Sequence, residues 1–401
     1  MTSTDPNSQT TTSIYDGFGR LTEVTGPGGI SKVNYTYDLT SIPVKVTSVT
    51  KVSDTENITA YSWSDGLGRT IETASEADDG YIISGVVDYD SRGQVIRKYL
   101  PRKIGTVPEG DCPYFSREDA KYVTYIYDPL GRVTQTIRPD NKVSQNIYTI
   151  TTTETINENG QRKRVARDAY GRIAKVEEFN EGAIYTTTYD YDTLGNLTGT
   201  TDTLGNTTSI TYDSLSRKIS MDDPDMHDWV YEYDDVGNLI SQTDAKGQTI
   251  TFDYDEINRL KTKSTGVTYT YDQGANGIGR LTSVSDLSGT TQFYYDILGR
   301  EERTVKTIDT ISYEIEREYD ALDRLTSVEY PDDVVVKYEY NRQGGIKRVY
   351  SPTPQGDVDY VTNATYSEHG QLLDITYGNG RKTTYSYDPN NLRLEHLVTA
   401  N

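Results

Sequence analysis

The sequence YDTLGNLTGTTDTLGNTTSITYDSLSR, residues 191–217, contains the two kinds of turn from which the rest of the chain is built. The unit Y-D-x-x-G-[RN]-[LV] opens at Tyr191 and returns at Tyr212, and a second turn of the same chemistry, 202–205, lies between them. Aspartate favours the first position of a type I turn, and glycine supplies the positive φ of a bulged hairpin. Each unit therefore predicts two strands of about six residues joined by alternating turns.

The unit recurs along almost the whole chain, and from Asp192 to Asp255 its aspartates follow one another every 21 residues. Where the glycine is missing, Asn258, Asp323 and Asn391 are expected to adopt the positive φ instead, whereas Ser216 has no such explanation. A degenerate unit is expected to turn at 157–160. The best copies supply the repeat signature, Tyr15, Asp16, Gly19, Arg20, Tyr127, Asp128, Gly131, Arg132, Tyr191, Asp192, Gly195, Tyr233, Asp234, Gly237, Tyr295, Asp296, Gly299 and Arg300.

Tyrosines precede the aspartate in pairs two residues apart, for example Tyr189 with Tyr191 and Tyr231 with Tyr233. Side chains two apart share one face of a strand, so the tyrosines are expected to stack on their cross-strand neighbours and stabilise the sheet. On the order of 30 strands would follow one another in this way. Because twisted sheets of more than about ten strands curl, we predict an all-β fold, a long antiparallel meander of tandem hairpins curled into a spiral β-sheet shell.

The repeats divide the chain into four predicted parts. Residues 1–13 read as a flexible N-terminal segment, 14–97 as irregular repeats, 98–122 as a Pro-containing insertion, and 123–401 as regular repeats. The last unit stops one strand after a turn, which would leave an unpaired edge. We therefore expect the 401 residues to be an excerpt of a longer polypeptide.

Composition excludes several classes of function. The 61 acidic residues exceed the 40 basic ones, giving a net charge of −21 that disfavours nucleic acid and anionic membranes as partners. No apolar run is long enough to span a membrane, and the first residues do not resemble a signal peptide. Cys112 is the single cysteine, so an internal disulfide is excluded.

The Y-D-x-x-G-R copies resemble the YD-repeat, or RHS-repeat, family, over roughly residues 14–395. This family includes RHS toxins, the B and C subunits of insecticidal toxin complexes, and teneurins. The resemblance implies a spiralling β-shell that encloses a C-terminal toxin in the bacterial proteins and forms part of an adhesion receptor in teneurins. The P-x-x-x-x-D-P-x-G motif that usually ends bacterial shells, and acts there in self-cleavage, is missing from this sequence.

Residues with catalytic or metal-binding chemistry are few. The three histidines, His227, His369 and His396, are too scattered for a catalytic triad or a zinc site, and structural roles are expected for them. Cys112 is expected to be a buried or idle thiol. The acidic loop at 221–229 leaves calcium open, through Asp222, Asp223, Asp225 and Asp228. The repeated arginines, such as Arg69 and Arg172, are expected to pair with acids of neighbouring units.

These observations favour a non-catalytic shell segment of a secreted protein, without cofactor or metal, that encloses or presents a toxin or other protein cargo. The alternative is an extracellular adhesion or carbohydrate-binding module that uses exposed tyrosine rows. The two hypotheses differ in whether the tyrosine rings are covered by neighbouring side chains or open to solvent. An enzyme is the third and least favoured class.

Overall fold

The computed structural model describes residues 1–40, 43–107 and 120–400. Within these ranges the chain forms 37 β-strands and one short 3-10 helix, Pro27–Gly29, and contains no α-helix. The predicted all-β meander of hairpins is therefore confirmed, with more strands than the 30 or so expected. No helix in the described part of the chain is long and apolar enough to cross a membrane.

The N-terminal strands form a nine-stranded antiparallel sheet in the order β1 to β8, with β11 at its far edge. Residues 1–13, predicted to be flexible, instead form β1 and most of β2, which pair from Thr2 with Thr12 to Thr4 with Thr10. The strands are β1 Thr2–Thr4, β2 Thr10–Tyr15, β3 Leu21–Thr25, β4 Lys32–Asp38, β5 Val44–Lys51, β6 Asn57–Ser64, β7 Thr70–Ala77, β8 Gly80–Ser84 and β11 Arg102–Ile104.

The other strands form one long antiparallel sheet that runs from β9 through β10 and then from β12 to β37. Its strands are β9 Val87–Tyr89, β10 Val95–Tyr99, β12 Tyr122–Tyr127, β13 Val133–Ile137, β14 Val143–Tyr148, β15 Thr152–Ile156, β16 Arg162–Arg167, β17 Ile173–Asn180, β18 Ala183–Tyr191, β19 Leu197–Thr201, β20 Thr207–Tyr212, β21 Lys218–Asp222, β22 Trp229–Tyr233, β23 Leu239–Thr243 and β24 Thr249–Tyr254. It continues with β25 Leu260–Lys263, β26 Val267–Tyr271, β27 Leu281–Asp286, β28 Gly289–Tyr295, β29 Glu301–Ile308, β30 Ile311–Tyr319, β31 Leu325–Glu329, β32 Val335–Tyr340, β33 Ile346–Ser351, β34 Val358–Tyr366, β35 Leu372–Tyr377, β36 Lys382–Tyr387 and β37 Leu394–Ala400.

The region predicted as an insertion, 98–122, joins the two sheets. Its first residues end β10, the segment Arg102–Ile104 adds to the first sheet as β11, and Tyr122 begins β12. Trp63 and Ile83 from the first sheet are buried here beside Tyr99 from the second, in the one cluster of buried hydrophobic residues found in the described ranges. Cys112 lies outside the described residues.

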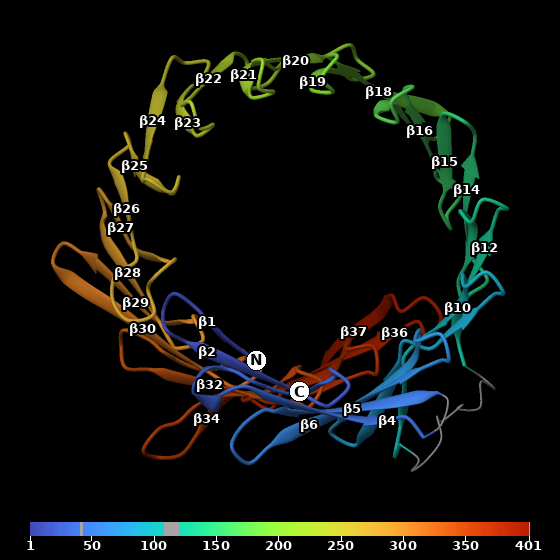
Figure 1. Cartoon of the computed structure of the whole chain (residues 1–401), viewed down its shortest axis with the longest axis vertical. Helices are drawn as coiled ribbons and strands as arrows, with labels where there is room; N and C mark the ends of the chain where they lie inside the picture. Colours follow the sequence, from blue (N-terminus) through green and yellow to red (C-terminus); the bar gives the residue numbers. More distant parts are fainter. Residues whose placement is uncertain (41–42, 108–119, 401) are drawn as a thin grey trace.

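Together the strands stand around a wide central space, and the first and last strands overlap at the bottom of the view (Figure 1). The overlapping segments touch at regular sequence separations. Asn7 and Ile278 exchange two hydrogen bonds across 271 positions, and the Lys121 ammonium donates to the Pro389 carbonyl across 268. One turn of the spiral therefore takes about 270 residues, and the chain makes about one and a half turns.

Turns alternate between the two edges of this wall, because neighbouring strands in each sheet are antiparallel. One edge, called here the YD rim, carries the Y-D-x-x-G turns, such as 16–19, 192–195 and 255–258. The other edge, called the opposite rim, carries the turns between them, such as 5–8, 138–141 and 202–205. The turn at 157–160 lies on the opposite rim, so it is not the degenerate unit predicted there; that role belongs to Tyr148 and the turn that follows it.

The positive φ predicted for the fourth turn residue is present in most units. Asn258 and Asp323 have φ of 65° and 62°, and Ser216, for which the sequence offered no reason, has φ of 63°. The last unit differs, because Leu392 rather than Asn391 has the positive φ. That turn is one residue longer, with the Leu392 amide donating to the Asp388 carbonyl, which displaces the left-handed position by one.

Gly195 offers a clean test of this turn geometry. Its φ is +94°, and a Cβ added there would meet no neighbouring atom closer than 3.8 Å, so a substitution changes backbone strain rather than packing. We expect Gly195→Val to destabilise the β18–β19 hairpin by about 1–2 kcal/mol or more, because an L-residue is strained in the left-handed region and a β-branched one especially so.

Amide hydrogen exchange across residues 186–201 is the measurement, because it reports local opening in a repeat array that does not unfold in one step. Thr193→Val, in the same turn, is the matched control and should leave exchange nearly unchanged. Equal acceleration in both variants would contradict the turn assignment.

Candidate functional site

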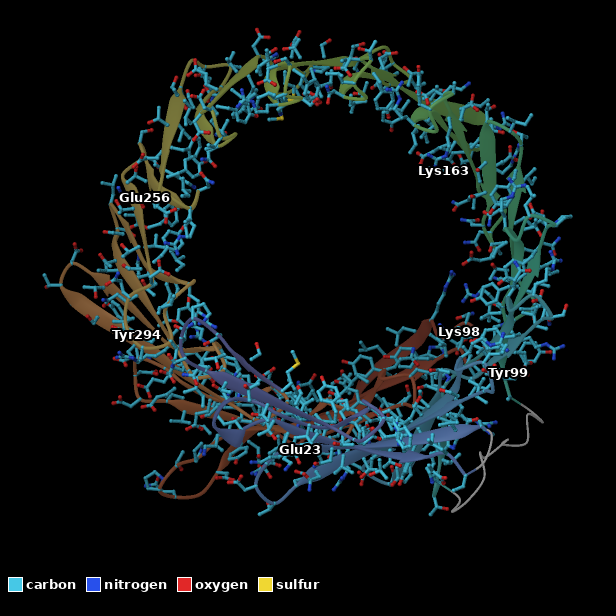
Figure 2. All side chains as sticks on the ribbon, in the orientation of Figure 1. Glu23, Lys98, Tyr99, Lys163, Glu256 and Tyr294 are labelled. Atoms are coloured by element: carbon cyan, nitrogen blue, oxygen red, sulfur yellow. The ribbon has the colours of Figure 1, made fainter. Side chains whose placement is uncertain are left out.

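The inner face of the ring is the candidate functional surface, and the repeat tyrosines lie on it. Figure 2 shows Lys98 and Lys163 pointing into the ring, and the side chains line its centre without filling it. Residues directly opposite one another in neighbouring strands share a face. Lys163 is opposite Glu178, and Glu178 is opposite Tyr185, which places Tyr185 and, by alternation along β18, Tyr191 on the inner face.

Lys98, lower on the same side of the ring in Figure 2, leads to the same result. It lies opposite Val123, and Tyr127 follows at an even spacing on β12. Successive strands therefore present aromatic and aliphatic side chains inward, such as Tyr231 on β22, Phe252 on β24 and Tyr269 on β26. Their alternate positions, Glu232, Asp253 and Thr270 among them, face outward and are exposed. The inner surface is consequently rich in aromatic rings, with lysines such as Lys98 and Lys163 among them, and the outer one is polar.

Each repeat turn is held by its aspartate, as the copy at Asp296 illustrates. Its Oδ1 accepts the amides of Leu298 and Arg300 at 2.9 Å each, and its Oδ2 accepts the Arg300 Nε at 2.7 Å. The Gly299 amide closes the turn on the Asp296 carbonyl at 2.9 Å. Arginine is thus bound first to the aspartate of its own unit, whereas the sequence pattern had suggested an acid of a neighbouring unit.

The same arginine also reaches the next unit. Arg300 Nη1 donates to the Asp320 carbonyl at 2.7 Å, and its guanidinium lies 4.8 Å from the centroid of the Tyr319 ring. The Tyr319 hydroxyl in turn donates to the carbonyl of Glu301, the residue after the arginine, at 2.9 Å. These three contacts between consecutive units are called here the latch. Arg300 also pairs with Asp323 of the next unit, at 2.9 Å, so the predicted neighbouring acid is a second partner in this copy.

The latch recurs with little variation around the ring. The Tyr127, Tyr191, Tyr233 and Tyr295 hydroxyls donate to the carbonyls of Val95, Ile173, Lys218 and Leu281 respectively. The arginine-over-tyrosine contact is made by Arg20 with Tyr37, Arg69 with Tyr89, Arg132 with Tyr148, Arg172 with Tyr191 and Arg259 with Tyr271. Asp16, Asp128, Asp192 and Asp234 hold their turns as Asp296 does, with asparagine replacing arginine after Gly195 and Gly237. Gly19, Gly131, Gly195, Gly237 and Gly299 all have φ between 79° and 99°, and Tyr15, in the first unit, is 47% exposed.

The latch replaces the tyrosine stacking that the sequence suggested. The ring-to-ring contacts in the described ranges involve Tyr61 with Trp63 or Tyr81, Tyr99 with Tyr122, and Trp229 with Tyr231, and none joins two motif tyrosines. Where the preceding unit carries an arginine, the motif tyrosine is instead covered on its face by that guanidinium, and its hydroxyl is already donated, as for Tyr191 and Tyr319. Sequence reasoning missed this pairing, although the recurrence of an arginine in one unit and a tyrosine in the next could have indicated it.

Burial shifts the pKa of several motif tyrosines, and hydrogen bonding shifts the pKa of the turn aspartates. Burial raises the pKa of Tyr254, Tyr295 and Tyr319 above 10. The Arg20 backbone amide, together with its guanidinium, holds the pKa of Asp16 below its usual range, and the Arg132 amide does the same for Asp128.

The tyrosine shifts predict a loss of stability at alkaline pH. A phenol whose pKa is higher in the folded chain than in the unfolded one stabilises the fold at every pH below its unfolded pKa of about 10, and that contribution is lost as the pH rises through the folded value. We expect the β-sheet signal in circular dichroism to fall above about pH 10, together with tyrosinate absorbance that rises later than in a free tyrosine. Tyrosinate formation at the free-tyrosine pH, with the sheet intact, would contradict this expectation.

A single hydroxyl measures the strength of the latch. Tyr254 donates to the Leu239 carbonyl at 2.9 Å, so Tyr254→Phe should weaken the β22–β24 region by about 1 kcal/mol. Tyr294, on the outer face of β28, provides the control, because no hydrogen bond of its hydroxyl is found within the described ranges. Chemical denaturation of Tyr254→Phe and Tyr294→Phe measures the difference. Equal midpoints would show that the hydroxyl bond adds nothing to stability.

The residues with catalytic or metal-binding chemistry remain dispersed. His227 lies in a turn, His396 is on exposed β37, and His369 approaches Glu368 with 3.6 Å between Nε2 and Oε1. In the acidic loop, Asp223 accepts the Thr208 hydroxyl at 2.7 Å and the amides of two following residues. Asp222, Asp225 and Asp228 do not join it in a metal site, since no group of three potential metal ligands occurs in the part of the chain that the structure describes.

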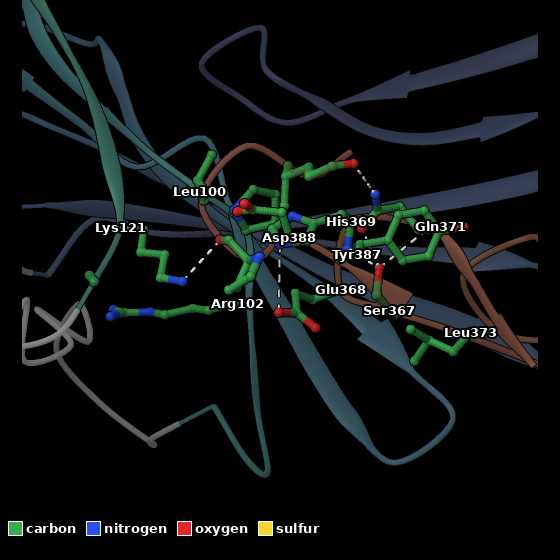
Figure 3. A pocket seen from close by; sticks show the side chains of 14 residues that line it. Leu100, Arg102, Lys121, Ser367, Glu368, His369, Gln371, Leu373, Tyr387 and Asp388 are labelled. Atoms are coloured by element: carbon green, nitrogen blue, oxygen red, sulfur yellow. Dashed lines mark hydrogen bonds and ion pairs between the residues drawn. The ribbon is translucent and has the colours of Figure 1, made fainter. Parts of the chain in front are cut away.

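A cavity of about 450 Å³ lies where the second turn of the spiral meets the first, between Leu100–Arg102 with Lys121 and the segments around Ser367 and Asp388 (Figure 3). Ser367 and His369 line it but are not arranged as nucleophile and base. The Ser367 Oγ accepts the amides of His369 and Gln371, and it thereby takes the place of the motif aspartate in this turn. One wall of the cavity is therefore built from repeat turns, and the other from the segment that joins the two sheets.

The RHS Repeat family matches four segments of the chain, residues 1–31, 191–225, 233–273 and 366–401. No curated protein matches the sequence. Among solved structures, the crystal structure of TcdB2-TccC3 covers 100% of the chain with a TM-score of 0.87 at 18% identity, and the chain covers 26% of that protein. The TcdB2-TccC3-TEV crystal structure gives a TM-score of 0.85 at 17% identity, with 100% and 28% covered.

The Photorhabdus luminescens Tc holotoxin pore is also similar, with a TM-score of 0.76 at 20% identity over 89% of the chain and 21% of that protein. Similarity at this level of identity concerns the fold. The chain spans about a quarter of the length of the solved chains that it matches.

Proposed function

Because the chain belongs to the RHS-repeat, or YD-repeat, family, we propose that it is a segment of a shell wall that encloses a protein cargo in a secreted toxin complex. The single observation that carries the proposal is the inward-facing aromatic surface of a ring whose centre is left empty by the side chains (Figure 2). An unfolded or partly folded polypeptide exposes apolar side chains, and a wall rich in aromatic rings offers a surface that binds them.

The distribution of polar groups supports enclosure over presentation. Outer positions such as Glu232, Asp253 and Glu318 are acidic and exposed, so they place part of the net charge of −21 on the outer surface. Aspartates of the repeat turns are bound to their own arginines or asparagines. The cargo identity and the toxin complex itself are part of the proposal, and the similarity to Tc toxin structures supports it through the fold.

The glycan-binding alternative is less compatible with the site. Carbohydrate binding by stacking needs an aromatic face open to solvent, and the motif tyrosines that follow an arginine unit present a face to that arginine and their hydroxyls to backbone carbonyls. The Arg172 guanidinium, for example, lies 4.6 Å from the Tyr191 ring centroid, and that hydroxyl donates to Ile173 at 2.9 Å. We propose likewise that the segment is non-catalytic, since Ser367 and His369, which line the same cavity, serve as turn residues.

The test is binding of a permanently unfolded probe, reduced and carboxymethylated α-lactalbumin, to the full 401-residue chain. The inner variant is Tyr231→Ser with Tyr269→Ser, and the outer control is Tyr294→Ser with Tyr350→Ser. The two pairs match, because each tyrosine ring has one cation beside it. On the inner face Lys218 lies beside Tyr231 and Lys263 beside Tyr269. On the outer face Arg303 lies beside Tyr294 and Arg348 beside Tyr350.

We expect the inner variant to bind the fluorescently labelled probe at least about tenfold more weakly in anisotropy titrations, since buried aromatic contacts dominate such interfaces. The outer control should bind as the unchanged chain does. Circular dichroism verifies that both variants fold. Equal affinity of all three proteins, or no binding by the unchanged chain, would contradict enclosure by the inner face.

A further inference from the structure

In most Y-D-x-x-G turns the third residue is a large apolar side chain that projects from the YD rim; Arg92, Gln343, His369 and Asn390 are the polar exceptions in the described units. Over the first turn of the spiral these tips are exposed by 67–87%: Phe18, Leu67, Leu130, Tyr170, Leu194, Leu215, Val236 and Ile257. Turn chemistry does not require an apolar residue at this position, because the side chain makes no contact needed for the turn. A repeated row of exposed apolar residues of this size marks an interaction surface.

The chain itself shows what covers such tips. In the second turn of the spiral, the equivalent residues Leu298 and Leu322 are only half-exposed, because the YD rim there lies against the opposite rim of the first turn. The Ala321 amide donates to the Val52 carbonyl at 3.2 Å, and a Cβ on Gly28 would come within 2.7 Å of Ile297. The partner of a YD rim is therefore an opposite rim one turn away.

Ion pairs set the register of this contact between turns. Arg342, on the YD rim, donates its amide to Asp78 at 2.9 Å and pairs through its guanidinium with Glu76 at 2.8 Å, and Lys347 pairs with Asp78 at 3.2 Å. Further along the ring, Glu158 on the opposite rim pairs with Arg138 of its own turn of the spiral and with Arg393 of the next turn. Burial of apolar tips and these charge pairs thus act together in one interface.

We propose that the exposed YD rim of residues 16–257 is a docking surface for the opposite rim of a second copy of this chain, which continues the spiral head to tail. The complementary surface is present on the same molecule. After residue 160 the opposite rim is not covered by another turn, and it too exposes apolar tips, Leu204 by 85% and Leu287 by 93%. Each free rim therefore extends for most of one turn.

The two rims also match in spacing. Turns of one kind recur at every second strand on both rims, which is about 9.6 Å along the wall. The contact is continuous with the interface that the two turns of one chain already form, and a heterologous contact of this kind joins copies in an open series. A single chain makes only about one and a half turns of the spiral, and each turn is one strand-length high. Stacked copies would extend this wall along the axis of the spiral.

The test is the state of association of the full chain and two rim variants, measured by sedimentation velocity. The YD-rim variant is Leu194→Asp, Leu215→Asp and Val236→Asp, and the opposite-rim variant is Leu204→Asp and Leu287→Asp. The control is Ser209→Asp and Thr251→Asp, which changes exposed side chains on the outer face in the middle of β20 and β24, away from both rims.

We expect the unchanged chain and the control to form a concentration-dependent series of oligomers that grows with added salt, because salt screens the repulsion between copies of charge −21. Each rim variant should be monomeric. An equimolar mixture of the two variants should stop at dimers, since one intact surface remains on each. A monomeric unchanged chain, or assembly of either variant like that of the control, would overturn the proposal.

Discussion

The structure depends on one local arrangement, the aspartate that closes each turn while holding the arginine that binds the next unit. A single carboxylate accepts two backbone amides and a guanidinium, as at Asp296, so the turn and the orientation of Arg300 are fixed together. The arginine then covers Tyr319 and binds the Asp320 carbonyl. Each unit thus positions its successor, and a wall without a second layer behind most of its length is kept in shape by contacts between neighbours.

The consequences extend from the unit to the ring. Because the motif tyrosines occupy the inner face and polar residues such as Glu232 and Thr270 occupy the outer one, the same strands that form the wall also give it an aromatic interior. About 270 residues complete a turn, after which the second turn rests on the first through the YD rim. The contacts Asn7 with Ile278 and Arg342 with Glu76 join parts of the chain that the repeat alone would leave far apart.

Much of this fold could be predicted from the sequence, because the interactions that determine it are local. The period of 21, the Asp and Gly of each turn and the alternation of tyrosines suffice to predict hairpins, a meander and its curling. The turn at 157–160 was misplaced because an N-x-x-G turn satisfies the same backbone geometry on either rim. In the last turn, Leu392 rather than Asn391 has the positive φ, because this turn contains one more residue. The effect of that residue depends on hydrogen bonds within the loop, which the sequence spacing does not reveal.

The candidate site was less accessible to sequence reasoning. Strand periodicity places Tyr189 and Tyr191 on one face, but the direction of curvature decides whether that face is concave, and curvature results from the sum of many small twists. Stacking of tyrosine on tyrosine was a reasonable expectation from their register, and it was wrong because a guanidinium at the right distance covers the ring more closely. Contacts between turns, such as that of Arg342 with Asp78, depend on the number of residues per turn and were not predictable.

The most direct test of the account is a distance between two residues that only a spiral of about 270 residues per turn brings together. Spin labels at Ser53→Cys and Asp323→Cys, in a chain with Cys112→Ser, would lie beside the contact of Val52 with Ala321. Pulsed electron paramagnetic resonance should then give a short distance, typical of neighbouring residues. An unrolled ribbon would separate the labels by about 120 Å, from about 25 strand steps of about 4.8 Å each. A distance in that range would contradict the spiral and every inference that depends on its inner face and its rims.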